Sequence, residues 1–394
     1  MKKTIKDFDL NNKRVIIRCD LNVPMENGKI LDDNRIKESL KTINYAIDNN
    51  AKVILLSHLG RIKEEQDKKA NDLKPVAKRL SELLNRNVVF VNETRGTVLE
   101  NTIKNMKPKD VVLVQNTRYE DLPLKKESSN DEELGKYWAS LGDIFINDAF
   151  GTAHRAHASN VGIASNLPSG LGFLMEKELK MLGEKLNDPQ RPYVVIAGGA
   201  KMKDKIEVID KLVEKADYVL LGGGIANTFL VAKEIDVKNS VYDEESVPHA
   251  KELLKKYSKK IILPVDGLGS IEYKDNLKVY SFDVNNITDG VMMLDIGEKT
   301  IDLYTKYLYQ AKTVFWNGPV GVNYFKNFEH GTKKLCEILK ASDAHVIIGG
   351  GDSAAAAISL GYKDSFDHIS TGGGAALEFI EGKKLPGVEA VSDK

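Results

Sequence analysis

The sequence has little cysteine and no long hydrophobic run. Only Cys19 and Cys336 are present among 394 residues, and neither lies at a CxxC or other metal-binding spacing. Two cysteines are too few for a disulfide framework, so we expect both to be reduced thiols packed as small apolar side chains. No run approaches the about 20 apolar residues of a membrane-spanning helix. Asp7 and Asp9 interrupt the N-terminal stretch where a signal peptide is apolar, so we expect a cytoplasmic protein without a membrane partner.

The chain also lacks net charge. Its 57 lysines and arginines balance 57 aspartates and glutamates, which disfavours a broad electrostatic surface for nucleic acid. With 42% hydrophobic and 29% charged residues, the composition is typical of a globular protein. The length is enough for about two to three domains with cores of their own. Any anion-binding site must therefore be local.

Arginine and glycine are unevenly distributed along the chain. All ten arginines lie at or before residue 191, whereas 21 of the 31 glycines lie beyond residue 190. Arginine presents a planar fork of donors to carboxylates and phosphates. Clustered glycines let a bare backbone approach a phosphate closely. We therefore expect anion recognition by side chains in the first half and by backbone N–H groups in the second.

Short apolar runs rich in β-branched residues alternate with longer amphipathic segments, which indicates an α/β fold with parallel sheets covered on both faces. The runs predict two sheets of about five or six strands each. They are RVIIRCD, AKVILLSHLG, NVVFV, DVVLVQN and DIFINDAFG in the first half, and YVVIAGG, DYVLLGGG, KIILPVD, KTVFWNGP, HVIIGGG and HISTGGG in the second. Residues 172–186 predict an amphipathic helix that connects the halves. The charged segment 121–133 predicts a solvent-exposed loop.

Polar residues follow four strands of the first half. In open α/β sheets ligands bind at the carboxyl ends of the strands, so we expect these residues to form one basic cup for a small polyanion. Arg35 joins them if Asp32, Asp33 or Asn34 caps a helix that begins beside it. Surface salt bridges are the alternative for any single member. The predicted cup contains Asp20, Asn22, Arg35, His58, Arg61, Arg118 and Arg155, with Asn116, His154 and His157 near it.

The second half repeats a pattern of strand, glycines and helix start at residues 198–199, 222–224, 349–351 and 372–374. Helix N-termini with exposed N–H groups bind anions. Lys201 and Lys205, four residues apart, are expected on one helix face beside the first glycine pair. A solvated lysine pair is the alternative. Asp352 can hold Mg²⁺ bound to nucleotide phosphates, or it can act as a helix N-cap.

Several common signatures are missing. The sequence contains no GxxxxGK[ST], no GxGxxG after a strand and no kinase HRD or DFG set. No Ser-His-Asp or Cys-His nucleophile pattern is present, and the histidines lack metal spacing. Phosphoryl transfer needs no nucleophilic side chain, because it depends on positioning and on positive charge around the transferred phosphate.

Seven motifs, in order and across nearly the whole chain, resemble the phosphoglycerate kinase family. They are RCDLNVP (18–24), SHLGR (57–61), NDAFGTAHRAH (147–157), GGAKMKDKI (198–206), WNGPVGV (316–322), GGGDSAAA (349–356) and STGGGAALEFIEGKKLPGVEA (370–390). The resemblance implies two Rossmann-like domains facing a cleft and joined by a hinge helix. It also implies reversible transfer of the acyl phosphate of 1,3-bisphosphoglycerate to Mg-ADP, giving 3-phosphoglycerate and ATP.

The resemblance implies domain limits as well. Residues 1–172, completed by about 381–394, form the domain that binds 3-phosphoglycerate. Residues 173–187 form the connecting helix, and residues 188–380 form the nucleotide-binding domain. The family further implies a monomer that closes by bending near 172–190 and 370–385.

Site residues follow from the same resemblance. The seven residues of the cup bind 3-phosphoglycerate, and Arg35, Lys201, Gly372 and Gly373 act at the transferred phosphate. Asp352 also holds the magnesium. The residues implied for the nucleotide are Lys201, Lys205, Met293, Asn317, Tyr324, Gly350, Gly351, Asp352 and Ser353.

Two departures from the family pattern concern the nucleoside. Phe-Glu usually follows WNGPxGV, with the glutamate on the ribose, whereas this chain has Asn323 and Tyr324. The WMGLD segment, whose glycine packs on the nucleoside, has Val291 for its tryptophan and Met293 for its glycine. We therefore expect retained chemistry with altered nucleoside contacts. The alternatives are a non-catalytic relative that senses phosphoglycerate or nucleotide, and a dinucleotide-dependent dehydrogenase of similar layout.

Overall fold

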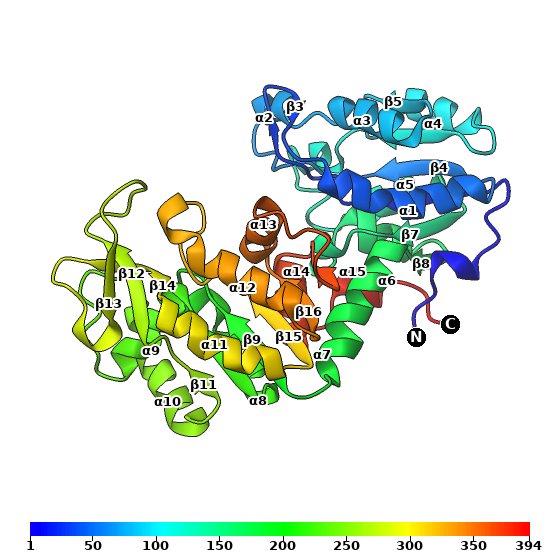
Figure 1. The fold of residues 1–394 in the computed structure, drawn as a ribbon. Helices are drawn as coiled ribbons and strands as arrows, with labels where there is room; N and C mark the ends of the chain where they lie inside the picture. Colours follow the sequence, from blue (N-terminus) through cyan, green and yellow to red (C-terminus); the bar gives the residue numbers. More distant parts are fainter. The chain divides into compact units, whose positions relative to one another are not determined.

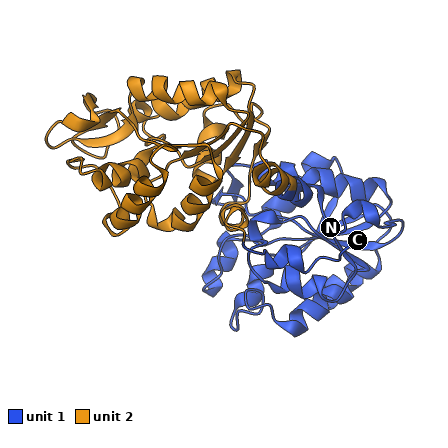
Figure 2. Ribbon diagram, turned by 90° about the horizontal axis from the view of Figure 1, so that it is seen from below, with its two compact units in different colours: residues 1–179, 383–394 blue, residues 180–382 orange.

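The computed structural model describes residues 1–394 and divides into two compact units. Unit 1 consists of residues 1–179 and 383–394, and unit 2 of residues 180–382 (Figure 2). Each unit is built on one six-stranded parallel sheet, so the predicted α/β class and the predicted pair of sheets are confirmed. Across the whole chain, none of the helices is both long and apolar enough to cross a membrane.

The sheet of unit 1 has the strand order β5-β6-β4-β1-β7-β8. Five of its strands are the predicted apolar runs, and the three-residue β8 was not predicted. The strands are β1 (Arg14–Arg18), β4 (Lys52–Leu56), β5 (Val88–Val91), β6 (Val111–Val114), β7 (Ile144–Asn147) and β8 (Ser169–Leu171). The helices are α1 (Asn34–Asp48), α2 (Glu65–Ala70), α3 (Lys74–Leu84), α4 (Thr97–Lys104), α5 (Glu132–Ser140), α6 (Phe173–Leu179) and α15 (Pro386–Glu389).

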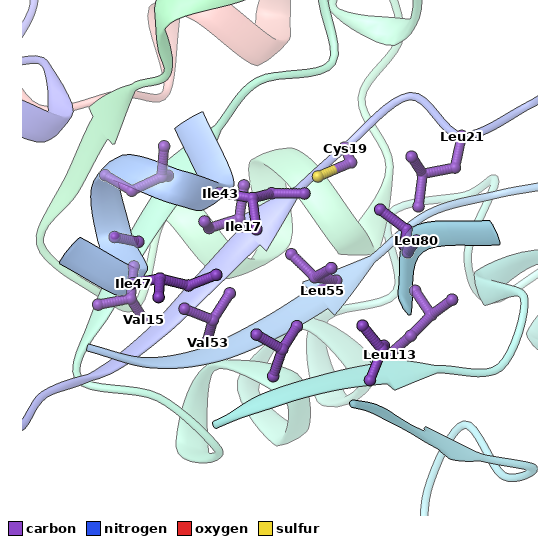
Figure 3. Close-up of a cluster of buried hydrophobic side chains, with 14 of the residues drawn as sticks. Val15, Ile17, Cys19, Leu21, Ile43, Ile47, Val53, Leu55, Leu80 and Leu113 are labelled. Carbon is purple, nitrogen blue, oxygen red and sulfur yellow. The ribbon is translucent and has the colours of Figure 1, made fainter. Parts of the chain in front are cut away.

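Both faces of this sheet are buried. Because side chains alternate across a strand, Val15 and Ile17 of β1 face one side and Ile16 faces the other. Val15 and Ile17 pack with side chains of α1 and α3 in one core (Figure 3). Ile16 packs with α4 and α5 around Trp138, which has no exposed surface. Burial on both faces explains why these strands read as continuous apolar runs.

The C-terminal tail belongs to unit 1. The N–H of Lys394 donates to the carbonyl of Met1 at 2.9 Å, and the two chain ends lie together in Figure 1. Asn147 Nδ2, at the end of β7, donates to the carbonyl of Gly387 at 2.9 Å. The tail is therefore fastened to the sheet end that carries the predicted cup.

The sheet of unit 2 has the order β11-β10-β9-β15-β16-β17, and all six strands are the predicted runs. They are β9 (Tyr193–Ala197), β10 (Tyr218–Leu221), β11 (Ile261–Ile262), β15 (Thr313–Asn317), β16 (His345–Gly349) and β17 (His368–Ile369). The helices are α7 (Lys185–Asn187), α8 (Ile206–Lys215), α9 (Gly223–Ala232), α10 (Val247–Tyr257), α11 (Glu298–Gln310), α12 (His330–Ala341), α13 (Gly351–Ser359) and α14 (Gly374–Ile380). Side chains of α9, α11 and α12 share one core with the sheet, whereas α8 contacts β9, β10 and α14.

Two small antiparallel sheets were not predicted. A three-stranded sheet of order β13-β12-β14 lies within unit 2, and β2 and β3 form a hairpin in unit 1. The first sheet comprises β12 (Asp266–Ser270), β13 (Tyr280–Asp283) and β14 (Met292–Ile296); the hairpin comprises β2 (Met25–Glu26) and β3 (Lys29–Ile30). Two of the five residues of β12 are glycines, which are rare in strand interiors, so its sequence carried little strand signal.

The segment predicted as a helix over 172–186 is helical. It begins with α6, continues as a π-helical turn over Lys180–Glu184 and ends with α7 at Asn187. Its first turn is held by Asp148, whose Oδ1 accepts from the N–H groups of Leu174 (2.9 Å) and Met175 (3.2 Å). A carboxylate at this end satisfies two helix donors that have no intrahelical partner.

Burial of Asp148 predicts a pH-dependent stability. Desolvation raises the pKa of Asp148 to about 7 in the folded state, whereas an aspartate in an unfolded chain titrates near pH ~4. Between these values the folded state binds the extra proton, so the free energy of unfolding falls as the pH rises, by at most ~1.4 kcal/mol per pH unit. This contribution is fully present below pH ~4 and is lost as the pH passes 7.

In the Asp148→Asn variant, the free energy of unfolding should no longer show this fall with rising pH. Urea unfolding followed between pH 5 and 8 by Trp138 fluorescence, in a Trp316→Phe background, reports on unit 1 because Trp138 is then the sole tryptophan. The exposed Asp9→Asn serves as the control and should keep the parent pH dependence. Equal slopes in the parent and Asp148→Asn would contradict the assignment.

Candidate functional site

The predicted cup residues of unit 1 follow four neighbouring strands. The order β6-β4-β1-β7 places the carboxyl ends of these strands side by side at one edge of the sheet. Asp20 and Asn22 follow β1, His58 and Arg61 follow β4, Arg118 follows β6 and Arg155 follows β7. We call these six residues, together with Arg35, the basic cup.

Arg35 reaches the cup from the start of α1. It is the second residue of that helix, as predicted, and its Nη1 donates to both carboxylate oxygens of Asp20 at 2.9 and 3.0 Å. Asp33 lies at the N-cap position, but its side chain makes no cap hydrogen bond and pairs with Lys37 and Arg79 instead. Of the three predicted caps, Asp32 makes a bond to the helix start, since its Oδ1 accepts from the N–H of Asn34, the first residue of α1, at 2.7 Å.

Asparagine side chains join the loops of the cup. Asn22 Oδ1 accepts from the N–H of Gly60 at 2.8 Å, which ties the loop after β1 to the loop after β4. Asn116 Oδ1 accepts from the N–H groups of Leu59 and Arg118, each at 3.1 Å. These bonds fix the backbone beside His58, Arg61 and Arg118.

Three guanidiniums of the cup form no direct ion pair. Arg61, Arg118 and Arg155 have no carboxylate oxygen within 4.0 Å. Arg118 Nε is buried without a hydrogen-bond partner, and desolvation lowers the pKa of Arg118. A charged donor that is buried and unpaired raises the free energy of the empty site. The cup is therefore arranged to receive an anion with several negative oxygens.

Two histidines beside these arginines are neutral. Burial, and then the charges of Arg18, Arg118 and further cations, lower the pKa of His58 well below its usual range. The same causes lower the pKa of His157 to about 3. The positive charge of the cup therefore comes from guanidiniums and not from these histidines.

A buried ion pair supports the cup, and the sequence analysis did not identify it. The side chains of Arg18 and Glu127 have no exposed surface, and Arg18 Nη2 lies 3.9 Å from Glu127 Oε1. Asp121 and Glu127 are both buried, so the prediction of a solvent-exposed loop over 121–133 is wrong at these two residues. The composition of the segment matches a solvated loop, and tertiary contacts with Arg18 of β1 and with Ser159 bury Glu127. The signal that could have found it was Arg18, because an arginine in a buried strand requires a carboxylate partner.

In unit 2 three of the four glycine clusters stand at helix starts, as predicted. Helix α9 begins at Gly223, α13 at Gly351 and α14 at Gly374. The first pair, Gly198 and Gly199, differs because a turn and a short 3₁₀ segment follow it and α8 begins only at Ile206. Lys201 and Lys205 therefore do not share a helix face, and the prediction that they do is wrong.

Lys205 lies against the backbone of two glycine loops. Its Nζ donates to the carbonyl of Gly198 at 3.1 Å, and a Cβ on Gly318 would lie only 2.7 Å from the same Nζ. Burial lowers the pKa of Lys205, and the nearby charge of Asp352 opposes this. Lys201 is exposed on the turn before the 3₁₀ segment. The loops of residues 198–205 and 317–320 and the start of α13 therefore share one region of unit 2.

The start of α13 holds the next predicted residues. Gly350 has φ of +93° and is the N-cap, so Asp352 is the second helical residue and not the cap. Ser353 Oγ donates to the carbonyl of Gly349 at 2.5 Å, and Asn317 Nδ2 donates to the same carbonyl at 3.0 Å. A Cβ on Gly351 would meet no atom within 4 Å, so its backbone is open to a ligand.

The last glycine cluster has the same open backbone. Gly373, the N-cap of α14, has φ of +52°, and a Cβ there would meet nothing within 4 Å. The N–H of Gly372 donates to Ser370 Oγ at 3.1 Å. A positive φ favours glycine at Gly373, and the free space leaves room for an anion beside its N–H.

The two residues that depart from the family pattern have different environments. Tyr324 is 68% exposed, and its hydroxyl forms a hydrogen bond with the hydroxyl of Tyr273, a residue that the sequence analysis did not single out. Met293 is 8% exposed in β14, and a Cβ on Gly267 would lie 2.9 Å from its Cε. Tyr324 is therefore available to solvent and ligands, whereas Met293 packs within the small sheet.

The donors present fit a magnesium ion that is bound mainly by a ligand. No three or more His, Cys, Asp or Glu side chains gather into a metal cage anywhere in the chain. Asp352 offers one exposed carboxylate in the first turn of α13, beside Lys205. Magnesium in phosphate sites uses one or two carboxylates together with phosphate oxygens and water. Asp352 can supply that carboxylate.

Comparisons with known proteins agree with each other. The family model described as phosphoglycerate kinase matches residues 5–383. A phosphoglycerate kinase from Fusobacterium nucleatum is 58% identical over 398 residues, and one from Enterococcus faecalis is 57% identical over 395 residues, each covering 100% of both chains. The solved phosphoglycerate kinase of Coxiella burnetii matches with a TM-score of 0.88 at 39% identity, covering 99% of this chain and 98% of that one. The enzyme of Pyrococcus horikoshii matches with a TM-score of 0.86 at 33% identity, covering 98% of each chain.

The neighbouring glycines at the start of α13 should respond differently to alanine. A Cβ on Gly350 would lie 2.6 Å from Asn317 Nδ2 and requires a φ of +93°, so Gly350→Ala should destabilise unit 2 by about 1–2 kcal/mol or more. Gly351→Ala meets no atom within 4 Å and should leave the melting temperature unchanged or slightly raised. Calorimetric unfolding of both variants compares them directly. Equal losses at the two positions would contradict the backbone geometry described here.

Proposed function

Because this chain belongs to the phosphoglycerate kinase family, we propose that the basic cup of unit 1 binds 3-phosphoglycerate and that the glycine loops of unit 2 bind the phosphates of ADP or ATP. The family membership establishes the reaction. The chain is a phosphotransferase of glycolysis that exchanges a phosphate between the carboxyl group of phosphoglycerate and a nucleotide. A non-catalytic relative and a dehydrogenase are not favoured by full-length relatives named as kinases.

The observation that carries the assignment of the cup is its set of unpaired guanidiniums. 3-Phosphoglycerate has a phosphate at one end and a carboxylate at the other, and both groups accept bidentate hydrogen bonds from arginine. Arg61, Arg118 and Arg155 form no direct ion pair, and Arg118 Nε is a buried donor without a partner. Asp20 and Asn22 follow the same strand end and can accept from the substrate hydroxyl.

The nucleotide assignment rests on open backbone and on Lys205. Gly350 is the N-cap of α13 and Gly351 has open space for a phosphate, and Lys205 and Ser353 supply a cation and a hydroxyl beside this helix start. Asn317 is bonded to the carbonyl that precedes this start. Mg²⁺, when bound with the nucleotide, would rest on Asp352 and would neutralise phosphate charge.

The chemistry requires charge neutralisation and no general base. The attacking carboxylate of 3-phosphoglycerate is ionised at neutral pH, because ordinary carboxyl pKa values lie well below 7. Arg35 and Lys201 are the cations assigned to the transferred phosphoryl group. Gly372 and Gly373 are assigned beside them, and the N–H donor comes from Gly373, because the N–H of Gly372 already donates to Ser370 Oγ. Arg35 Nη1 already pairs with the carboxylate of Asp20, which holds the guanidinium in position. The Nε and Nη2 groups of Arg35 remain available.

Domain limits, hinge, cellular location and oligomeric state belong to the same proposal. The domains are residues 1–172 with about 381–394, the connecting helix 173–187, and residues 188–380. Bending near 172–190 is supported by the π-helical turn over Lys180–Glu184, because such turns depart from regular helical hydrogen bonding. Exclusion of water during transfer requires a closing motion of this kind. We assign the enzyme to the cytoplasm, where soluble glycolytic metabolites are available. We also assign it as a monomer.

Replacing Arg35 with alanine should lower kcat by two or more orders of magnitude, because a cation at a transferred phosphoryl group contributes several kcal/mol to the transition state. A coupled steady-state assay with 3-phosphoglycerate, Mg²⁺ and ATP measures this and also tests the reaction in the parent chain. Arg86→Ala, an exposed arginine of unit 1, is the matched control and should retain the parent rate. Turnover of Arg35→Ala at the parent rate would remove Arg35 from the transfer step.

Tyr324 should determine how the nucleoside is held. A phenol makes one hydrogen bond where a carboxylate accepts two, so the parent should bind ADP more weakly or discriminate less between ADP and GDP than the Tyr324→Glu variant. The ratio of kcat/KM for ADP and GDP, measured in both proteins, tests this. Tyr309→Glu, at an exposed tyrosine of α11, controls for added charge. Unchanged efficiency and unchanged preference in Tyr324→Glu would refute the role.

A further inference from the structure

His58 accepts a hydrogen bond from Arg18 beneath the basic cup. Arg18 Nη2 lies 3.3 Å from His58 Nδ1, and both side chains are buried. A guanidinium is a donor only and remains charged in proteins, so Nδ1 must be the acceptor of this bond. A histidine ring that accepts at Nδ1 is neutral and carries its proton on Nε2.

The other nitrogen of the ring remains available. His58 Nε2 has no hydrogen-bond partner within the chain, and it is not among the fully buried unpartnered atoms. The side chain as a whole is only 6% exposed. The Nε2–H group therefore lies at the small exposed part of the His58 side chain, within the basic cup.

Arg18 is held from three sides. Its Nε donates to Ser159 Oγ at 2.8 Å, and its Nη1 donates to the carbonyl of Cys19 at 2.6 Å. Ser159 Oγ in turn donates to Glu127 Oε1 at 2.5 Å, and the N–H of Ser159 donates to Glu127 Oε2 at 2.9 Å. Glu127 thus balances the guanidinium charge and directs the Ser159 lone pair towards it.

We propose that Glu127, Ser159 and Arg18 form a positioning relay that fixes His58 in the Nε2–H tautomer, so that His58 donates a hydrogen bond to an oxygen of the bound phosphoglycerate. The identity of that ligand rests on the function proposed above. The tautomer does not, because it follows from the bonds within unit 1. Arg18 and Glu127 touch no substrate in this arrangement and act through His58.

The surroundings of His58 favour the same state. Burial opposes a charge on the ring most strongly, and Arg18 of β1, Arg118 after β6 and Arg35 of α1 add to this. The ring is therefore kept neutral by its burial and by cations on three different elements. A neutral His58 adds no charge to the cup. Its Nδ1 cannot become the donor towards Arg18, because the guanidinium has no acceptor atom.

The tautomer can be observed directly in the full chain. Two-bond ¹H–¹⁵N correlation spectra of protein labelled at histidine distinguish Nε2–H from Nδ1–H and from the charged ring, and loss of the signal in His58→Gln assigns it. We expect the Nε2–H pattern for His58 from pH 6 to 9. A charged ring, or a proton on Nδ1, in the parent protein would overturn the proposal.

Two variants of the relay and one control test its action. Glu127→Gln removes the charge and Ser159→Ala removes the connecting hydroxyl, and each should produce a mixture of His58 tautomers and raise KM for 3-phosphoglycerate about tenfold. The KM for ATP should stay within about twofold, which a general loss of structure would not produce. Glu120→Gln alters another buried carboxylate of unit 1, bonded to Thr94 and Arg95, and should change neither tautomer nor KM.

Substitution of His58 itself distinguishes donor from acceptor. Glutamine places an amide N–H near the position of Nε2, whereas asparagine reaches only the position of Nδ1, so His58→Gln should retain at least tenfold more affinity for 3-phosphoglycerate than His58→Asn. Equal KM values for the two variants, or relay variants with parent KM and parent tautomer, would overturn the relay. A parent chain without kinase turnover but with the Nε2–H pattern would instead refute the ligand assignment alone.

Discussion

The buried guanidinium of Arg18 is the constraint on which the arrangement of the basic cup in unit 1 depends. An arginine without exposed surface is tolerated only where its charge is balanced and its donors are bonded. Glu127 supplies the charge, and Ser159, the Cys19 carbonyl and His58 receive the N–H groups. Because β1, the loop after β4 and the segment around Glu127 all meet at this side chain, its bonds also fix the strand ends that carry the cup.

The two units present different chemical groups at the sites proposed for anions. Unit 1 uses side chains, with three guanidiniums that form no direct ion pair at the ends of adjacent strands. Unit 2 presents backbone at helix starts, where Gly350 and Gly373 adopt positive φ and a Cβ on Gly351 or Gly373 would meet no atom within 4 Å. This division matches the two ligands, because a small acid with two different anionic ends needs directional forks, whereas a chain of phosphates needs several closely spaced donors. The uneven distribution of arginine and glycine in the sequence reflects this division between side-chain and backbone donors.

Most of the fold could be predicted from the sequence, and the failures have physical causes. Strands such as β1 and β9 are buried on both faces, so their apolar runs were unmistakable. The β12 strand was missed because Gly267 and Gly269 remove the side chains that would reveal its period. The helix expected at Lys201 was wrong because a glycine pair there is followed by a turn whose length the sequence does not specify. Glu127 could not be distinguished from its charged neighbours without the contact to Arg18, which spans more than a hundred residues.

The packing of Met293 separates its departure from that of Tyr324. In the family pattern a glycine stands at the position of Met293, and here Met293 pairs with Gly269 of the neighbouring strand. Its side chain reaches Gly267 on the same strand, where a Cβ would lie 2.9 Å from Met293 Cε and 2.9 Å from the ring of Phe282. The added methionine is therefore accommodated by a missing side chain on the neighbouring strand. Phe282 and Met293 share the core of unit 2, so this exchange acts first on packing. Tyr324 has no such compensation within the core, since its side chain is mostly exposed and is bonded only to the hydroxyl of Tyr273. Of the two departures, the change at Tyr324 is consequently the one that a bound nucleoside would meet directly.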